Sequence, residues 1–237
     1  MNTGNWTRCW QQHLDTYLQA PPRCGYWLYS RFPLGPKTRV LEIAGGSFRD
    51  SNFLAQQGVP VYGIDADSYV VEQVKLRLKP TFELLVGDAF SMPFEAKAFY
   101  LSFSNGFLVC FPDTEIQKLL QEQARVTERW LVFLVHNAEN RKLLEQFRQL
   151  AQKDPVYRIR FFNRSEVRSL VLGSGLPIIS IRLLKFGGPA DKLYRISRTF
   201  LPWLPLGIVR AVVARLYTFQ PWNRVERIAC VANLQSV

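Results

Sequence analysis

The chain is poor in the residues that most often carry metal-binding or nucleophilic chemistry. Its 237 residues include only 2 histidines and 4 cysteines. No two cysteines stand at zinc-finger or redox spacing, which argues against a structural zinc site and a disulfide scaffold. Four scattered cysteines are typical of reduced, buried thiols in a cytoplasm. They are Cys9, Cys24, Cys110 and Cys230.

The sequence shows neither the pattern of a secretory signal nor an uninterrupted membrane-spanning run. The first residues contain no basic stretch followed by an apolar core, so we expect no secretory signal and a cytoplasmic protein. The most apolar stretch, residues 200–219, is interrupted by Pro202, Pro205, Arg210 and Arg215. Because charges at the centre of a bilayer are costly, we interpret the stretch as an amphipathic lid or an interfacial helix. An interfacial helix would place the protein in peripheral contact with a membrane.

Acidic residues are scarce in the last two-fifths of the chain. Residues 1–140 contain 13 basic and 14 acidic residues, and residues 141–237 contain 17 basic and 5 acidic ones, so the net charge of +11 is the sum of −1 and +12. A solvated basic face can simply increase the solubility of the protein. It can also attract an anionic partner, such as a phosphorylated substrate, a lipid surface or RNA.

What the chain does contain is a repeated pattern of short apolar strands that end in acidic or small residues. The first strand, 39–43, runs into a glycine turn, and the second, 60–64, ends at Asp65. The third and fourth, 82–86 and 98–103, run into further turns of this kind. Ligands of open α/β sheets bind at the carboxyl ends of the strands, so the pattern predicts one shared crevice.

The alternation of strands with helical segments predicts an α/β fold with a doubly wound sheet and a parallel core. The segment 1–36, rich in aromatic residues, is expected to form helices packed across the open end of this sheet. Further strands are expected near 130–135, 177–185 and 227–233, and helices near 51–57, 68–78, 114–128, 139–153 and 164–173.

Residues 40–137 contain, in this order, the turn 42–48, the acid Asp65, and the runs 87–90, 104–108 and 122–126. In their order and spacing these motifs resemble those of a class I S-adenosylmethionine-dependent methyltransferase. The resemblance implies a Rossmann-like seven-stranded sheet, mostly parallel with an antiparallel last strand. It also implies an N-terminal helical cap at 1–36, a methyltransferase domain at 37–237, and a hydrophobic, basic insertion at about 188–223 between strands six and seven.

The resemblance further implies S-adenosyl-L-methionine as the cofactor and a set of site residues. Asp65 is expected to bind the ribose, Asp88 to lie near the adenine, and Gly46 to lie where backbone and ligand meet. His136, just past the fifth strand, is a candidate general base, with a structural role as the alternative. The predicted cofactor-binding residues are Glu42, Ala44, Gly45, Gly46, Asp65, Ala66, Asp88, Ala89, Phe90, Ser104 and Asn105.

Two positions depart from the family pattern. Ala44 and Phe48 stand where the family usually has its first and third glycines. We expect Ala44 to be tolerated with a negative φ, and Phe48 either to turn its ring away from the cofactor or to form a wall of the pocket.

The sequence thus predicts methyl transfer to a small or lipid-linked acceptor, with oxygen favoured by analogy. The alternatives are a non-catalytic binding or scaffold protein with the same fold, and an RNA-associated methyltransferase. Nucleic acid is the less favoured partner, because the run 104–107 lacks the residues of the amino- and cytosine-methylating groups.

Overall fold

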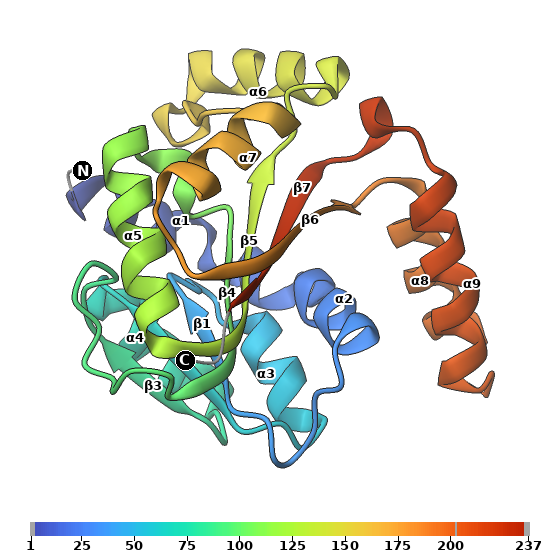
Figure 1. Ribbon diagram of the computed structural model, residues 1–237, viewed down its shortest axis with the longest axis horizontal. Helices are drawn as coiled ribbons and strands as arrows, with labels where there is room; N and C mark the ends of the chain where they lie inside the picture. Colours follow the sequence, from blue (N-terminus) through green and yellow to red (C-terminus); the bar gives the residue numbers. More distant parts are fainter. Residues whose placement is uncertain (1–2, 202, 235–237) are drawn as a thin grey trace.

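The computed structural model describes residues 3–201 and 203–234 and contains one seven-stranded sheet with the order β3-β2-β1-β4-β5-β7-β6 (Figure 1). Strands β1 to β5 pair in parallel, and β7 runs antiparallel to both β5 and β6. This confirms the predicted fold class. The strands are β1 Val40–Ile43, β2 Val61–Asp65, β3 Glu83–Val86, β4 Phe99–Asn105, β5 Thr127–His136, β6 Ile178–Phe186 and β7 Arg227–Leu234.

The helices follow the predicted alternation, and local sequence explains several of their ends. Helix α4 begins after Asp67, whose carboxylate accepts a hydrogen bond from the amide of Val70. Asn163 and Glu166 form a reciprocal capping box at the start of α7. The helices are α1 Thr3–Gln19, α2 Arg23–Arg31, α3 Arg49–Gln56, α4 Ser68–Leu78, α5 Asp113–Val126, α6 Arg141–Lys153, α7 Arg164–Gly173, α8 Pro189–Phe200 and α9 Leu206–Phe219.

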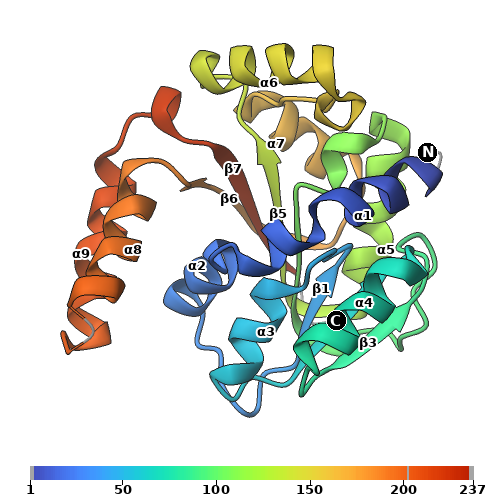
Figure 2. The same cartoon turned by 180° about the vertical axis from the view of Figure 1, so that it is seen from behind.

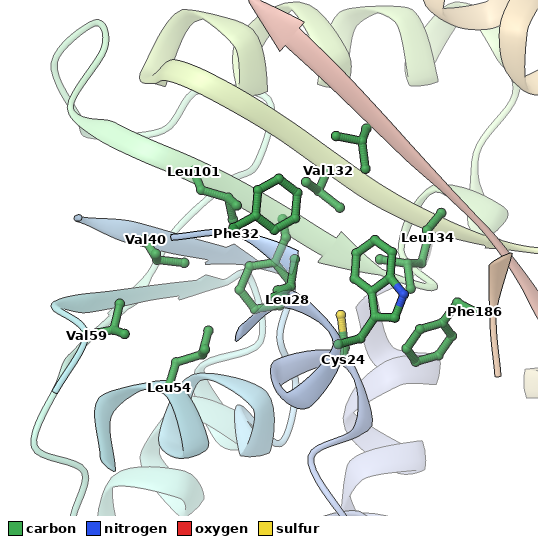
Figure 3. Close-up of a cluster of buried hydrophobic side chains, with 14 of the residues drawn as sticks. Cys24, Leu28, Phe32, Val40, Leu54, Val59, Leu101, Val132, Leu134 and Phe186 are labelled. Atoms are coloured by element: carbon green, nitrogen blue, oxygen red, sulfur yellow. The ribbon is translucent and has the colours of Figure 1, made fainter. Parts of the chain in front are cut away.

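Both faces of the sheet are covered, so its central strands are apolar on both sides. On one face Cys24 and Leu28 of α2 pack with Leu54 of α3 against Leu101 and Val132 of the sheet (Figure 3). On the other face α5 and α7 cover β5 and β7. These two layers hold the carboxyl ends of β1, β2 and β4 in fixed positions at one edge of the sheet.

The predicted insertion forms a helical hairpin, α8 and α9, that stands beside β6 (Figures 1 and 2). Tyr217 of α9 packs into the same core cluster as α2, and the guanidinium of Arg31 lies 5.4 Å from its ring centroid. Pro202 and the side chains of Leu206 and Arg210 lie outside the described residues. Within the described residues, no helix is both long and apolar enough to cross a membrane.

Helix α1 crosses the carboxyl edge of the sheet (Figure 2). Its Leu14 packs with Val70, Val71 and Val74 of α4 in a buried cluster. The strand order changes direction at β1 and β4, and ligands of such sheets bind outside the carboxyl ends of the strands at this point. The element that covers this region is the N-terminal helix α1, which lies in the segment expected to pack across the open end of the sheet.

Candidate functional site

The turn after β1 keeps the backbone of a glycine-rich loop although it holds few glycines. Ala44, Gly46 and Phe48 have φ values of 52°, 56° and 49°. The left-handed region costs a residue with a Cβ about 1–2 kcal/mol. The expected negative φ of Ala44 is wrong: the turn needs a positive φ at each position where the family has glycine. Strain of this kind persists where surrounding structure holds it in place and is common at functional sites.

The ring of Phe48 is turned into the protein and is fully buried. A Cβ placed on Gly45 or on Gly63 would come within 2.5 Å of this ring, so both glycines are needed for it to fit. Phe48 belongs to the buried cluster that α1, α4 and β3 form. Of the two expectations for this residue, the structure has the ring turned away into the core.

Asp65 joins the end of β2 to the glycine turn. Its Oδ2 accepts a hydrogen bond from the amide of Gly46 at 3.0 Å, and its Oδ1 accepts one from the amide of Asp67 at 3.0 Å. Burial raises the pKa of Asp65, while these amides act to lower it. The amide of Ala66 also acts on this carboxylate, and because a carboxylate has about four lone-pair sites, it can still accept from a ligand such as a ribose.

Glu42 supports the turn from inside the protein. Its Oε2 accepts hydrogen bonds from the amide of Ser51 at 3.0 Å and from the Ser51 hydroxyl at 2.5 Å. Burial and the neighbouring charge of Asp50 raise the pKa of Glu42 to about 8. Glu42 is therefore mainly protonated at neutral pH, and the structure places it below the turn.

The ring of Trp10 lies directly on Gly46. A Cβ added to Gly46 would come within 2.3 Å of two ring atoms of Trp10. A cavity of about 150 Å³ lies beside α1, lined by Cys9 and Gln12 together with Cys110 and Ile159. Ligand pockets for cofactor-sized molecules usually measure about 300–1,000 Å³. A cofactor at Gly46 therefore requires α1 and the Trp10 ring to move outward.

The turn after β3 lies beside Asp65 and is more open. The amide of Gly87 donates to the carbonyl of Asp65 at 2.9 Å, which joins the two turns. Asp88 is exposed, and its Oδ1 accepts a hydrogen bond from the amide of Phe90 at 2.9 Å. Ala66 is also exposed, and Ala89 is partly buried. The structure thus brings Gly46, Asp65 and the 87–90 turn together.

The two predicted site residues at the end of β4, Ser104 and Asn105, have different environments. Ser104 is buried, and its hydroxyl has no hydrogen-bond partner among the described residues. Asn105 accepts a hydrogen bond through its Oδ1 from the guanidinium of Arg227, the first residue of β7. Nothing in the sequence around Arg227 forms a motif, so sequence reasoning missed this residue.

His136 at the end of β5 lies among aromatic side chains. Its ring centroid is 5.1 Å from that of Phe147 and 5.3 Å from that of Phe161, and its Nδ1 is buried without a partner in the described part of the chain. Burial, together with the charge of Arg227, holds the pKa of His136 well below its usual range. The imidazole is therefore neutral at physiological pH and can accept or donate one hydrogen bond.

Comparison with known families gives one match within the chain. Residues 40–129, which contain β1 to β4, α5 and the three turns described above, match the model of a methyltransferase domain. No curated protein matches the chain.

Solved structures with the same fold include an S-adenosylmethionine-dependent methyltransferase from Archaeoglobus fulgidus, with a TM-score of 0.62 and 13% identity over 89% of this chain and 92% of that one. The magnesium protoporphyrin IX methyltransferase of Synechocystis has a TM-score of 0.55 and 14% identity over 95% and 83%. The geranyl diphosphate C-methyltransferase of Streptomyces coelicolor has a TM-score of 0.56 and 13% identity over 90% and 78%. At such identities the likeness shows the fold.

Proposed function

We propose that this chain, whose residues 40–129 match the model of a methyltransferase domain, is a class I S-adenosylmethionine-dependent methyltransferase that transfers a methyl group to a small or lipid-linked acceptor. Bound S-adenosylmethionine supplies an electrophilic methyl group on a sulfonium, so the protein has to align the acceptor and exclude water. Oxygen is the proposed acceptor atom. This choice rests on analogy with the family.

The observation that carries the proposal is the hydrogen bond between Gly46 and Asp65 at the switch point of the sheet. It holds a carboxylate beside a left-handed turn that is strained at Ala44 and Phe48, and backbone strain of this kind is common at functional sites. The residues fit an adenosyl ligand: Asp65 retains lone pairs for the ribose hydroxyls, and Gly46 leaves space for close approach once Trp10 moves. Asp88 stands exposed on the adenine side.

His136 is proposed to assist an acceptor that must lose a proton. As a neutral imidazole with a buried, unpartnered Nδ1, it can take a hydrogen bond from such a group. Its low pKa makes it a weak base. It therefore suits an acceptor that is already acidic, such as a carboxylic acid or a phenol, better than an alcohol.

The exposed apolar residues of the α8–α9 hairpin favour a lipid-linked acceptor or contact with a membrane surface. Phe200 and Trp203 are each 73% exposed, and Phe219 is 81% exposed. Residues 188–224 contain six basic residues and one acidic residue, which suits an anionic lipid surface. Among the structural neighbours, the enzyme from Streptomyces acts on geranyl diphosphate, which joins an apolar chain to an anionic group.

The position of Trp10 favours a second candidate function, a non-catalytic binding or scaffold protein. In this case the ring of Trp10 would permanently occupy the space next to Gly46, and no cofactor would bind there. Loss of two family glycines would then reflect loss of the ligand.

Mass spectrometry of the protein purified under native conditions separates the two candidates. The methyltransferase proposal predicts a complex whose added mass equals that of S-adenosylmethionine or its demethylated product, and release of that molecule on denaturation. Incubation with either ligand at millimolar concentration provides the second arm. A folded protein that carries neither ligand, and takes up neither when it is supplied, supports the scaffold function.

A further inference from the structure

Three arginines gather beside the carboxyl ends of β4 and β5, on the side of the sheet that α2 and α3 cover. They are Arg23 in α2, Arg49 at the start of α3, and Arg227 at the start of β7. Arg23 and Arg49 act electrostatically on Arg227 and lower its pKa, although burial has the larger effect. Like charges this close repel one another, and such an arrangement needs a compensating charge.

Among the described residues, only one of the three arginines has a carboxylate partner. Arg23 pairs with Glu226 at 2.9 Å. Arg227 donates to the neutral amide oxygen of Asn105, and Arg49 donates to the backbone carbonyl of Tyr17 at 3.1 Å. The Nε of Arg49 is buried and has no hydrogen-bond partner among the residues that the structure describes. Within the described part of the chain, neither Arg49 nor Arg227 forms an ion pair.

The nearby acids have other partners. Asp50 interacts electrostatically with both Arg49 and Arg227, and its carboxylate accepts a hydrogen bond from the amide of Gly25 at 2.8 Å. Glu42 accepts hydrogen bonds from Ser51, and Glu226 pairs with Arg23. No carboxylate of the described residues therefore forms an ion pair with Arg49 or Arg227.

We infer that Arg227 and Arg49 bind an oxyanion, a carboxylate or phosphate group of a ligand, at the carboxyl end of β4. Guanidinium groups hold such anions through paired, charge-assisted hydrogen bonds. Arg227 keeps part of its surface exposed, and its guanidinium donates to a neutral amide oxygen, a bond that an anion can replace. Gly106 permits this placement, because a Cβ there would come within 3.2 Å of Arg227 Nη1.

The identity of the ligand rests on the proposed function, and either of two molecules can supply the oxyanion. One is the amino-acid carboxylate of S-adenosylmethionine. The other is an acidic group on the acceptor, which the basic excess of residues 141–237 would attract. Either molecule would present an oxyanion to the two arginines. A variant of Arg227 distinguishes the two cases.

The first arm tests the site with inorganic pyrophosphate, independently of any cofactor. Thermal unfolding is followed with and without pyrophosphate, at an ionic strength matched with chloride. We expect a rise in Tm of about 3–6 °C when the anion is about tenfold above its Kd. Arg227→Gln should abolish the rise and Arg49→Gln should reduce it. The exposed Arg224→Gln is the matched control and should keep it. No rise in the wild-type protein, or an equal rise in Arg227→Gln, overturns the inference.

The second arm identifies the source of the oxyanion. S-adenosylhomocysteine carries the amino-acid carboxylate, and methylthioadenosine lacks it. If the cofactor supplies the anion, Arg227→Gln weakens binding of the first by about tenfold or more and leaves the second unchanged. If the acceptor supplies it, both nucleosides bind as in the wild type while the effect of pyrophosphate is lost. Failure of both nucleosides to bind would contradict the proposed function. The pyrophosphate result would then decide on its own whether Arg227 and Arg49 form an oxyanion site.

Discussion

The amide of Gly46 donates a hydrogen bond of 3.0 Å to Oδ2 of Asp65, which joins the turn after β1 to the end of β2. This bond fixes the orientation of a carboxylate that is otherwise held only by amides of its own turn. It also fixes the left-handed Gly46 beneath the ring of Trp10. Asp65, the turn after β1 and helix α1 therefore form one unit, and variants of each part should affect ligand binding in different ways.

Ala44→Gly should stabilise the protein. Ala44 has a φ of 52°, which glycine adopts without cost from a Cβ. Relief of this strain exceeds the entropy that glycine adds to the unfolded chain, so we expect a gain of about 0.5–1 kcal/mol in the free energy of unfolding. Denaturant unfolding measures it. Ala55→Gly in α3 is the control and should cost about 1 kcal/mol; a loss in both variants would contradict the strain at Ala44.

Glu42→Gln should change how stability depends on pH. The folded-state pKa of Glu42 is about 8, above the ordinary value of 4.5, so the folded protein holds a proton that the unfolded chain releases. The stabilising contribution of this proton is complete below about pH 4.5 and is lost as pH rises towards 8. Glutamine cannot release a proton, and the decline between these values should become shallower.

The measurement for Glu42 is the free energy of unfolding at several pH values between about 5 and 8.5. Glutamine retains an oxygen that can accept from Ser51, so the hydrogen bonds of the turn are kept. Glu83→Gln, at an exposed position of β3, serves as the control. An unchanged slope in Glu42→Gln would show that Glu42 is already ionised in the folded protein.

Trp10→Ala should speed the entry of ligand. The Trp10 ring occupies the space above Gly46, so a ligand has to displace it before binding. We expect the association rate of S-adenosylhomocysteine to rise by about threefold or more, as the barrier to moving α1 falls. Stopped-flow binding measures this rate. Trp203→Ala, on the exposed hairpin, should leave it unchanged, and equal rates in wild type and Trp10→Ala would show that the ring does not obstruct the site.

The double variant Phe200→Ser/Trp203→Ser should lose affinity for anionic vesicles. Burying one large apolar side chain contributes about 1.5–3 kcal/mol, so removal of two exposed ones should weaken partition by about tenfold or more. Co-sedimentation at low and high salt measures it. Leu76→Ser replaces an exposed residue of α4, which is 68% exposed, and should have no effect. Absence of vesicle binding by the wild type at low salt would favour a water-soluble acceptor.

The sequence predicted the strands and most helices closely because their signals are local. Helix α4 has the predicted bounds 68–78, since Asp67 caps its start and Val70, Val71 and Val74 recur on one face. The predicted strands differ from the observed ones by a few residues, mainly at β5, which begins at Thr127. The sheet order then follows from the alternation and from right-handed crossovers.

The parts that could not be predicted depend on contacts between distant residues. The positive φ of Ala44 reflects a turn held by Asp65 and by the burial of Phe48, and no local pattern signals it. The contact of Trp10 with Gly46 depends on how α1 docks on α4. Arg227 meets Asn105 across 122 positions of sequence. Residues of this kind define the candidate site as much as its motifs do.

The central claim is that the crevice at Asp65 binds an adenosyl cofactor, and calorimetry with S-adenosylhomocysteine tests it most directly. We expect saturable binding to the wild-type protein, and a loss of about 1.5–3 kcal/mol in Asp65→Asn, because charge-assisted hydrogen bonds to the ribose are removed. Glu72→Gln, at an exposed position of α4, should bind as the wild type does. Heats that show no binding to the folded wild-type protein, or equal affinity in Asp65→Asn, would contradict the claim.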